Sequence, residues 1–437
     1  MSHQYRYKQI ACLLATAALS SACGSVFASA FQLMEQNVTN LGTAYAGTAS
    51  LAIDASTGFY NSAGLTRICE EQVALSAIGL KVHSRLRIDS ARDTIGNLVP
   101  GVPGVVNSQD QALIPGLHYA ARLDDCWVFG LNVVTPFGLQ STYYESSQVR
   151  YMGTRSELRT YDIAPSLAYC FGSGFSIGAG PDFLYGFAAI DQNLRLPLPV
   201  RGTPSEATIS NRLAGWGVGG HFGALFEISD CTRVGINYRS PIMVKARGTS
   251  QFISDRLGLN TIDEVRSTIT FPDTVVASVF HQFDDCWAIM ADAQWTNWNR
   301  FKELRVDNVV RNSTVIQTHN FRSTWRFAVG TSYQFDECFL GRFGVAYDRS
   351  PVRDNLRTTR IPDADRTWVA IGARYNITPC LAIDAGYAHL FFKNARINQR
   401  ADTRVGTPGF VESGEQLQGN YKTGVSILGL QLTWDIA

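Results

Sequence analysis

The sequence predicts an all-β membrane protein, a transmembrane antiparallel β-barrel of about fourteen strands with an N-terminal hatch, or plug, inside its lumen. Three observations predict this fold class. Long segments of the chain alternate between apolar and polar residues. The connections between these segments are alternately short and long, and a polar, glycine-rich segment precedes the first of them. We therefore divide the 437-residue chain into a signal peptide (1–30), a hatch (31–70) and a barrel (71–437).

The alternation is clearest near the C-terminus. Leu428, Leu430 and Leu432 fall on one face of a strand, and Gln431 and Thr433 fall on the other. Successive side chains of a strand point to opposite faces, so this period of two separates a lipid-facing side from a lumen-facing side. A soluble β-sandwich would also alternate, but its strands rarely exceed about ten residues.

The composition and motif content exclude several function classes. Lys and Arg number 38 against 37 Asp and Glu, so a formal charge of +1 gives no reason to expect a nucleic-acid partner. No zinc-protease or P-loop signature is present, and the seven His are scattered. We therefore expect no enzyme, no cofactor and no metal site, and we interpret His118 and His221 as residues that line the lumen.

The first 30 residues are typical of a secretory signal peptide. Residues 10–19 form the apolar region, and Ala28–Ala30 is a small-x-small cleavage site, so Phe31 is the expected first mature residue. A lipoprotein signal that ends at Cys23 is the alternative. It is disfavoured because Ser20, rather than a large aliphatic residue, lies three positions before that cysteine.

Each cysteine of the mature chain lies at one strand-pair boundary, and Asp124–Trp127 repeats the four residues of Asp284–Trp287. This spacing predicts that all of them lie at one rim of the barrel. Neighbouring turns are about 10 Å apart, more than the Cα separation of about 7 Å that a disulfide spans, so we expect free thiols. The cysteines are Cys69, Cys126, Cys170, Cys231, Cys286, Cys338 and Cys380.

Two of the long connections, about 191–209 and about 248–267, carry apolar residues, and we expect the second to contain a short amphipathic helix. Exposed apolar patches usually mark a binding surface, although the two loops could also pack on each other as a lid. A third connection, 349–366, is Arg-rich and is interpreted as a solvated loop, with lipopolysaccharide contact as the alternative. The apolar residues are Leu196, Leu198, Leu257 and Leu259.

A barrel of about fourteen strands encloses a lumen wider than its own side chains can fill. Phe31–Leu65 is the only sizeable N-terminal segment outside the predicted strands. Its small and polar residues suit close packing against inward-facing side chains, and irregular backbone is tolerated where it does not face lipid. We therefore expect this segment to plug the lumen.

The same segment resembles the hatch of the outer-membrane long-chain fatty-acid transporter family, which includes aromatic-hydrocarbon channels. The similarity rests on FQLMEQNVTNLGTAYAGTA followed by DASTGFYNSAGL. Asn61-Ser62-Ala63 stands at the family's Asn-Pro-Ala motif, with Ser in place of Pro. Further matches lie at Thr135–Leu139, Trp295–Phe301, Trp325–Gly330, Arg342–Pro351 and Ile361–Arg366, so the resemblance covers essentially the whole mature chain.

The resemblance implies a plugged barrel in the outer membrane of a Gram-negative bacterium that passes hydrophobic molecules by diffusion. In the family, an apolar groove between external loops captures the ligand, an internal pocket holds it, and a hatch shift or a lateral opening releases it. Carried onto this chain, the hatch or gate residues are Asn61, Ser62 and Ala63. The contacts for the hydrophobic ligand are Phe31, Phe137, Leu139, Leu196, Leu198, Leu257 and Leu259.

A fatty-acid carboxylate inside the barrel would need a cation, and Arg326, Arg342 and Arg374 are candidates. The alternative is that they pair with Asp348 or Asp384. Long-chain fatty acids are the expected substrates, aromatic hydrocarbons are the first alternative, and a general porin or adhesin is the second. The expected surroundings are outer-membrane lipid, lipopolysaccharide and the barrel-assembly machinery, and we expect a monomer.

Overall fold

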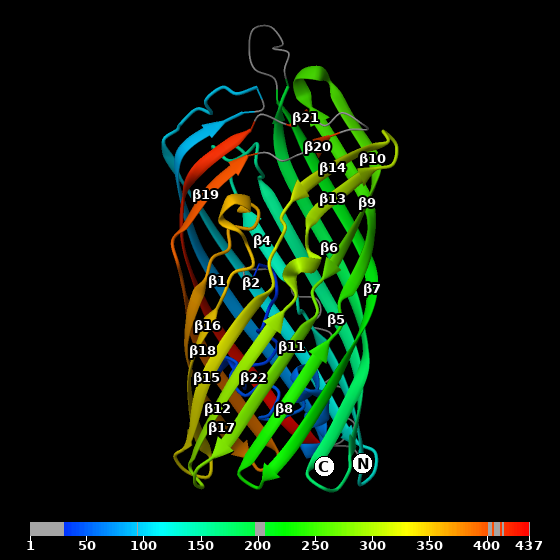
Figure 1. The fold of residues 1–437 in the computed structure, drawn as a ribbon, viewed down its shortest axis with the longest axis vertical. Coiled ribbons are helices and arrows are strands. Elements are labelled where there is room, and N and C mark those ends of the chain that lie inside the picture. The colour runs from blue at the N-terminus through cyan, green and yellow to red at the C-terminus, as the bar shows by residue number, and fades with distance from the viewer. Residues whose placement is uncertain are drawn as a thin grey trace.

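The computed structural model describes residues 30–93, 95–196, 206–400, 404–405, 411–412 and 415–436. Within these residues a single antiparallel sheet closes on itself, because the first strand, β1 (Glu71–Arg92), pairs with both β2 (Gly104–Arg122) and the last strand, β22 (Gln416–Ile436). Figure 1 shows the resulting tall barrel. Of the predicted signal peptide, only Ala30 lies within the described residues. No described helix is long and apolar enough to cross a membrane.

The described residues form fourteen wall strands, as predicted, and four of these strands are interrupted and carry two labels. After β1 and β2 come β3 (Trp127–Val134) with β4 (Gly138–Thr142), β5 (Arg155–Cys170), β6 (Phe175–Arg195), β7 (Glu206–Ser229), β8 (Thr232–Arg239) with β9 (Ile242–Ser254), and β10 (Leu259–Phe271) with β11 (Thr274–Gln282). The wall continues with β12 (Trp287–Thr296), β15 (Thr324–Gln334), β16 (Phe339–Asp348), β17 (Arg366–Thr378), β18 (Leu381–Phe392) with β19 (Ala395–Arg400), and β22.

The remaining strands lie in the upper part of the barrel in Figure 1, where β13 pairs with β10 and β14 pairs with β20. They are β13 (Glu303–Asn308), β14 (Ser313–Thr318), β20 (Arg404–Val405) and β21 (Val411–Glu412). The short helices are η1 (Leu41–Thr43), α2 (Thr57–Tyr60), η2 (Ser62–Arg67), η3 (Asp255–Leu257), η4 (Trp298–Arg300) and η5 (Asp354–Leu356).

The wall strands have one apolar exposed face and one buried face, which confirms the predicted alternation. Trp216 and Val218 of β7 are 58% and 64% exposed, whereas His221 on the other face is 4% exposed. In β22, Leu428 is exposed and Gln431 is buried. Because water does not favour so much contiguous apolar surface, this outer face is suited to lipid.

The N-terminal segment, residues 30–68, lies against the inner face of the wall and is buried over almost its whole length (Figure 1). Its backbone bonds to inward-facing side chains from distant strands. Gly47 N–H donates to Asp292 of β12 (2.6 Å), Val38 N–H donates to Gln431 of β22 (2.9 Å), and Ala49 N–H donates to Ser278 of β11 (2.9 Å). That residues 31–70 act as a separate hatch remains a prediction.

Wall glycines allow the segment to approach the strands closely. A Cβ added at Gly344 of β16 would overlap the backbone of Thr43, and one at Gly223 of β7 would overlap the side chain of Asn61. Small residues on both sides therefore let the segment and the wall meet backbone to backbone.

The short connections between wall strands lie at one rim of the barrel, and all seven mature cysteines are found there, unbridged in the structure. Five of them directly precede an outgoing strand, as Cys231 precedes β8, and Cys69 lies two residues before β1. The expected separation of about 10 Å is wrong for one pair. Cys170 ends β5 while Cys126 directly precedes the neighbouring β3, so these two are one strand spacing apart.

Two loop expectations are also wrong. Residues 248–267 form a β-hairpin from β9 and β10 with only the turn η3 at its tip. The buried Val265 and Ser267 alternate with the exposed Glu264 and Arg266, which is the pattern of a strand and not of a helix. The Arg-rich loop 349–366 is not solvated throughout, since Arg357 and Arg360 are 3% and 5% exposed. It folds inward, and Arg360 donates to Ser156 of β5 (2.8 Å).

Candidate functional site

The N-terminal segment closes a break in the wall between β3 and β4. At Thr135–Phe137 the strand is interrupted, and Pro136 has no N–H to donate to a ladder. The segment supplies the missing partners. Leu33 N–H donates to Pro136 O and Gly138 N–H donates to Phe31 O, both at 2.8 Å. Residues 31–33 thus act locally as an extra strand beside the break.

Gln36 completes this closure with a pair of side-chain bonds. Its amide nitrogen donates to Thr135 O and its amide oxygen accepts from Thr135 N–H, both at 2.9 Å. On the other side, His118 of β2 bonds to Gln36 O at 2.9 Å. A displacement of the first residues of the segment would therefore expose unpaired backbone groups in the wall.

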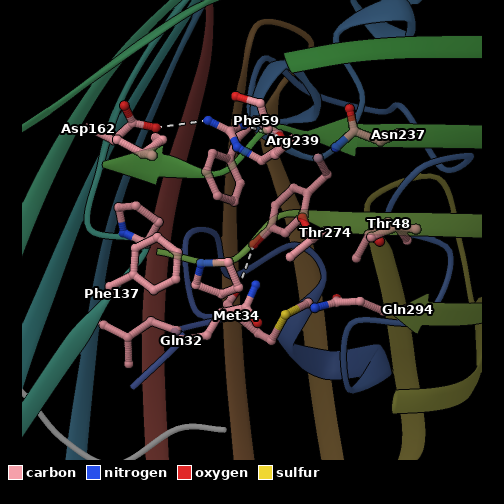
Figure 2. A pocket seen from close by; sticks show the side chains of 17 residues that line it. Gln32, Met34, Thr48, Phe59, Phe137, Asp162, Asn237, Arg239, Thr274 and Gln294 are labelled. Atoms are coloured by element: carbon pink, nitrogen blue, oxygen red, sulfur yellow. Dashed lines mark hydrogen bonds and ion pairs between the residues drawn. The ribbon is translucent and has the colours of Figure 1, made fainter. Parts of the chain in front are cut away.

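Two cavities flank these residues. The inner cavity, of about 50 Å³, is drawn in Figure 2 and is bordered by Gln32, Met34 and Phe137 together with wall residues from β5, β8, β9, β11 and β12. In it, Arg239 of β8 donates to Asp162 of β5 at 2.8 Å and lies over the ring of Phe59.

The outer cavity, of about 60 Å³, is bordered by the upper parts of β5, β6 and β10 and by β13 and β14. It therefore lies nearer the end of the long loops than the inner cavity does. Its lining is mostly apolar. The apolar lining residues are Phe31, Leu139, Leu158, Ala188, Ile190, Ile269, Phe301, Leu304 and Ile361.

Phe31 lies between the two cavities. It borders the outer cavity while the next residue, Gln32, borders the inner one. The Phe31 ring is 2% exposed and sits in an aromatic cluster, with ring centroids 4.6 Å from Trp298, 5.1 Å from Phe301 and 6.1 Å from Phe271. Edge-to-face packing of this kind stabilises the closed arrangement, so a ligand that passes between the cavities must move this side chain.

The outer cavity is bordered by one carboxylate, Glu157, and one guanidinium, Arg360, and the nearby Asp191 and Glu415 act electrostatically on Arg360. Glu157 borders the cavity but forms ion pairs with both Arg155 and Arg159. Arg360 also borders it, and each of its hydrogen bonds goes to a neutral acceptor, with Ser156 Oγ at 2.8 Å and Gln192 Oε1 at 2.7 Å the shortest. Burial lowers the pKa of Arg360 to about 10, so the side chain stays cationic at neutral pH.

His319 borders the same cavity without adding charge. Burial, and then the nearby Arg360, lower the pKa of its imidazole to about 3. The ring is therefore neutral, and its Nε2 has no hydrogen-bond partner. The outer cavity thus combines an apolar wall, one neutral donor or acceptor and a guanidinium whose direct hydrogen bonds all go to neutral acceptors.

The three arginines proposed for the carboxylate do not border either cavity. Arg342 and Arg374 both pair with Asp384, at 2.5 and 3.3 Å. Arg326 donates to Ala44 O of the N-terminal segment and leaves Nε and Nη1 without partners. Arg342 and Arg374 therefore pair with an aspartate of the lumen, which is the alternative to a role in binding a carboxylate.

The predicted loop residues lie apart from the two cavities. Leu196 follows β6 and is half-buried, and Leu198 lies outside the described residues. Leu257 and Leu259 are 45% and 44% exposed at the tip of the β9–β10 hairpin. Ser254 near that tip donates to Glu206 O (3.1 Å), which joins the hairpin to the start of β7.

The hatch motif is anchored to the wall. Asn61 donates to Ala49 O (2.6 Å) and to Ala224 O of β7 (2.9 Å), and its side-chain oxygen accepts from Ala63 N–H (3.1 Å) at the start of η2. Ser62 and Ala63 are fully buried, and Ser62 Oγ has no partner. The Asn side chain therefore fixes this turn even with Ser in place of Pro.

A Ser–His–Asp chain crosses three neighbouring strands. Ser166 Oγ lies 2.8 Å from His221 Nε2, and His221 Nδ1 lies 2.8 Å from Asp182. The geometry is that of a catalytic triad, but all three side chains are buried and neither cavity borders Ser166. Gly174–Gly178 also reads G-x-S-x-G, a motif that can carry a nucleophilic serine. Here Ser176 lies within strand β6, and its Oγ accepts a hydrogen bond from Thr66 Oγ1 (2.9 Å).

Sequence reasoning missed Arg360, His319 and the aromatic residues around Phe31. The Arg-rich composition predicts a solvated loop around Arg360, although Ile361 and Pro362 beside it are apolar. Trp298 and Phe301 lie in a matched segment, but nothing in their spacing indicates that they meet Phe31. Among the described residues, no group of three or more His, Cys, Asp or Glu is arranged to hold a metal ion.

Comparisons with known proteins agree with this architecture. Residues 19–436 match the model of a family described as outer membrane protein transport protein (OMPP1/FadL/TodX). Outer membrane protein P1 of Haemophilus influenzae is 28% identical over 422 residues, covering 89% of this chain and 91% of its own. The long-chain fatty acid transport protein of Escherichia coli O6:H1 is 26% identical, covering 91% of this chain and 94% of its own.

Solved structures share the fold. A FadL homologue of Pseudomonas aeruginosa has a TM-score of 0.84 at 24% identity, covering 93% of this chain and all of its own. The toluene transporter TodX of Pseudomonas putida has a TM-score of 0.69 at 17% identity, with 94% and 100% coverage. Family members are transport channels of the Gram-negative outer membrane that carry hydrophobic substrates, and they are not enzymes. This chain belongs to the OmpP1/FadL/TodX family of outer-membrane transport proteins.

Proposed function

We propose that the chain takes up long-chain fatty acids and that the outer cavity holds the acyl chain with its carboxylate on Arg360. The supporting observation is the charge of this cavity, in which Glu157 is neutralised by two arginines while Arg360 meets only neutral acceptors. A carboxylate would give Arg360 a charge-assisted partner, and the apolar lining would remove the alkyl chain from water at about 25 cal/mol per Å².

Release is proposed to depend on the first residues of the N-terminal segment. A ligand in the outer cavity contacts Phe31, and moving Phe31 breaks the bonds that close the wall at Pro136. The inner cavity borders that same break. The proposed route therefore runs from the outer cavity past Phe31 into the inner cavity, and then out beside β3 and β4 or towards the periplasm.

Capture is proposed to occur at the external loops that carry Leu196, Leu198, Leu257 and Leu259. The exposed apolar side chains at the β9–β10 tip support a role in collecting hydrophobic molecules from lipopolysaccharide. Asn61, Ser62 and Ala63 are proposed to hold the fixed end of the hatch. We also propose that the protein inserts through the barrel-assembly machinery and works as a monomer.

Aromatic hydrocarbons are the second candidate substrates. The inner cavity is lined by Phe59, Tyr60 and Phe137, whose rings suit a small aromatic ligand, and the structurally similar TodX of Pseudomonas putida is a toluene transporter. Such a ligand has no carboxylate, so it would not require Arg360.

Equilibrium binding of oleate, methyl oleate and toluene to the purified barrel separates these candidates. We expect Arg360→Gln to weaken oleate binding about tenfold, since a hydrogen bond to a charged group contributes roughly 1.5–3 kcal/mol, and to leave methyl oleate unchanged. Arg353→Gln, an exposed arginine of the same loop, is the matched control. Equal loss for oleate and its ester would contradict the role of Arg360, and wild-type protein that binds toluene but not oleate would favour the hydrocarbon.

A further inference from the structure

Two of the rim cysteines are direct neighbours across a strand pair. The ladder of β3 and β5 ends with Trp127 opposite Tyr169, and one step further Cys126 stands opposite Cys170. The Cys170 N–H donates to Cys126 O at 3.0 Å, so the ladder continues through this pair. Directly opposed residues of antiparallel strands have Cα atoms about 4.5–5.5 Å apart, which falls within the range of about 4.4–6.8 Å found for disulfides.

The two side chains lie on the same face of the sheet. Trp127 and Tyr169 form a ring contact with centroids 4.7 Å apart, which places both on one face. Val128 and Ala168 follow on the opposite, buried face. Since side chains alternate along a strand, Cys126 and Cys170 share the buried face with Val128 and Ala168. Both cysteines are half-buried, whereas the other five are exposed.

No other rim cysteine of the described chain has a cysteine opposite it. The carbonyl oxygens of Cys231, Cys286, Cys338 and Cys380 accept the same kind of bond as Cys126 O, but the donors are Gln282, Gln334, Asn376 and Asp435. Cys69 precedes β1, and its sulfur lies 3.7 Å from Arg67 O. The repeated position of the cysteines therefore yields one pair with the register of a cross-strand bridge.

We propose that Cys126 and Cys170 form a disulfide in the mature protein. The short turns of outer-membrane barrels face the periplasm, so we expect this rim to lie in an oxidising compartment. One thiolate attacks the disulfide of a periplasmic thiol–disulfide exchange protein, and the second thiolate displaces the exchange protein from the mixed disulfide. The two thiols lose two protons and two electrons, and the exchange protein leaves as a dithiol.

The bridge ties β3 to β5 on the rim side of the wall break at Thr135–Phe137. Next to it, Leu65 of η2 packs so closely on β3 that a Cβ at Gly130 would meet it at 2.6 Å. The covalent link therefore holds the rim half of β3 on β5 and beneath the N-terminal segment. It does so even if the first residues of that segment leave the break at Thr135–Phe137.

The test counts thiols in cells. Cells that express the full chain are quenched with acid, the protein is denatured and alkylated without reductant, and peptides are analysed by mass spectrometry. We expect five of the seven mature cysteines to be alkylated and a Cys126–Cys170 cross-linked peptide that reduction removes. Seven alkylated cysteines, or a bridge between any other pair, would overturn the proposal.

Single substitutions sharpen the count. Cys126→Ser leaves six cysteines, and all six should be alkylated because Cys170 has lost its partner. Cys231→Ser, at the equivalent position of another turn, should leave four alkylated and keep the bridge. If Cys126→Ser and Cys231→Ser give the same number of alkylated thiols, the pairing is wrong. Heat-modifiable migration in gels reports whether each variant forms the barrel.

Discussion

The two ends of the N-terminal segment pack against the barrel in different ways. Residues 40–65 meet wall glycines backbone to backbone, as Thr43 does at Gly344, and Asn61 links them to β7. Residues 31–36 lie between two cavities instead, and the Glu35 carboxylate there has no hydrogen-bond partner. From this difference we propose that residues 40–65 form the fixed part of the segment and that residues 31–36 can move, so that ligand passage needs a local shift and not the loss of the whole segment.

Removing both ends together should have the largest effect. Without Phe31–Leu65 a lumen of about fourteen strands has nothing to fill it, so we expect conductance in planar bilayers to rise about tenfold or more. Removing residues 31–36 alone should raise conductance much less. A full deletion that still forms a heat-modifiable barrel and conducts like the wild type would show that the segment is not a plug.

Crowding the fixed end should destabilise the protein. A Cβ at Gly344 overlaps the Thr43 backbone, so Gly344→Ala should cost roughly 1–3 kcal/mol, measured as a lower temperature for loss of the compact gel form. Gly79→Ala is the matched control, because the nearest atom to a Cβ there is 3.8 Å away. If both variants melt alike, the close contact at Gly344 does not hold the segment.

The movable end should respond to pH. Burial raises the pKa of Glu35 to about 7, against the opposing effects of Arg366 and Arg326. The Glu35 carboxyl is therefore protonated up to about pH 7 in the docked state, whereas in the unfolded state it is protonated only below about pH 4.5. Because the docked state holds this proton more tightly, docking of residues 31–36 weakens as pH rises through about 7. Between pH 6 and 8 we expect docking to weaken about tenfold.

Hydrogen exchange of the peptide that contains residues 31–36 measures this docking. Glu35→Gln serves as the reference at each pH, since it removes the titrating group and leaves the intrinsic pH effect on exchange. The protection of the wild type relative to this variant should fall between pH 6 and 8. A constant ratio would mean that Glu35 does not control the docking.

Substitutions at Leu196 and Leu257 should have the smallest effect, since neither residue borders either cavity. We expect Leu196→Asp combined with Leu257→Asp to lower uptake of a labelled fatty acid a few-fold without changing binding to the detergent-solubilised protein. Binding and uptake that fall together would move these loops into the binding site, and unchanged uptake would remove them from capture.

The wall could be predicted from the sequence because its signal is local. Residues such as Leu428 and Gln431 alternate along one strand, and each strand carries this pattern independently. The plug was predicted from the volume of the lumen and from the resemblance. Neither the volume of the lumen nor the resemblance requires knowledge of which strands are neighbours.

The site could be predicted only in part because it depends on contacts between distant residues. Phe31, Phe137 and Leu139 do border the cavities, whereas Arg360 reaches them only because its loop folds inward. Arg342 and Arg374 face the lumen as the alternation predicts, but the position of Asp384 between them depends on strand order. Likewise, the pairing of Cys126 with Cys170 follows from register and not from spacing.

We infer that residues 31–36 must move for a ligand to pass from the outer cavity into the inner cavity. Gln32 and Phe137 are bridge partners across the wall break, so Gln32→Cys with Phe137→Cys, in a chain whose own cysteines are serines, can lock them together. Uptake of labelled oleate into proteoliposomes is then compared before and after reduction. We predict that the oxidised protein binds oleate but does not pass it, and that reduction restores uptake. Equal uptake in both states would contradict the account.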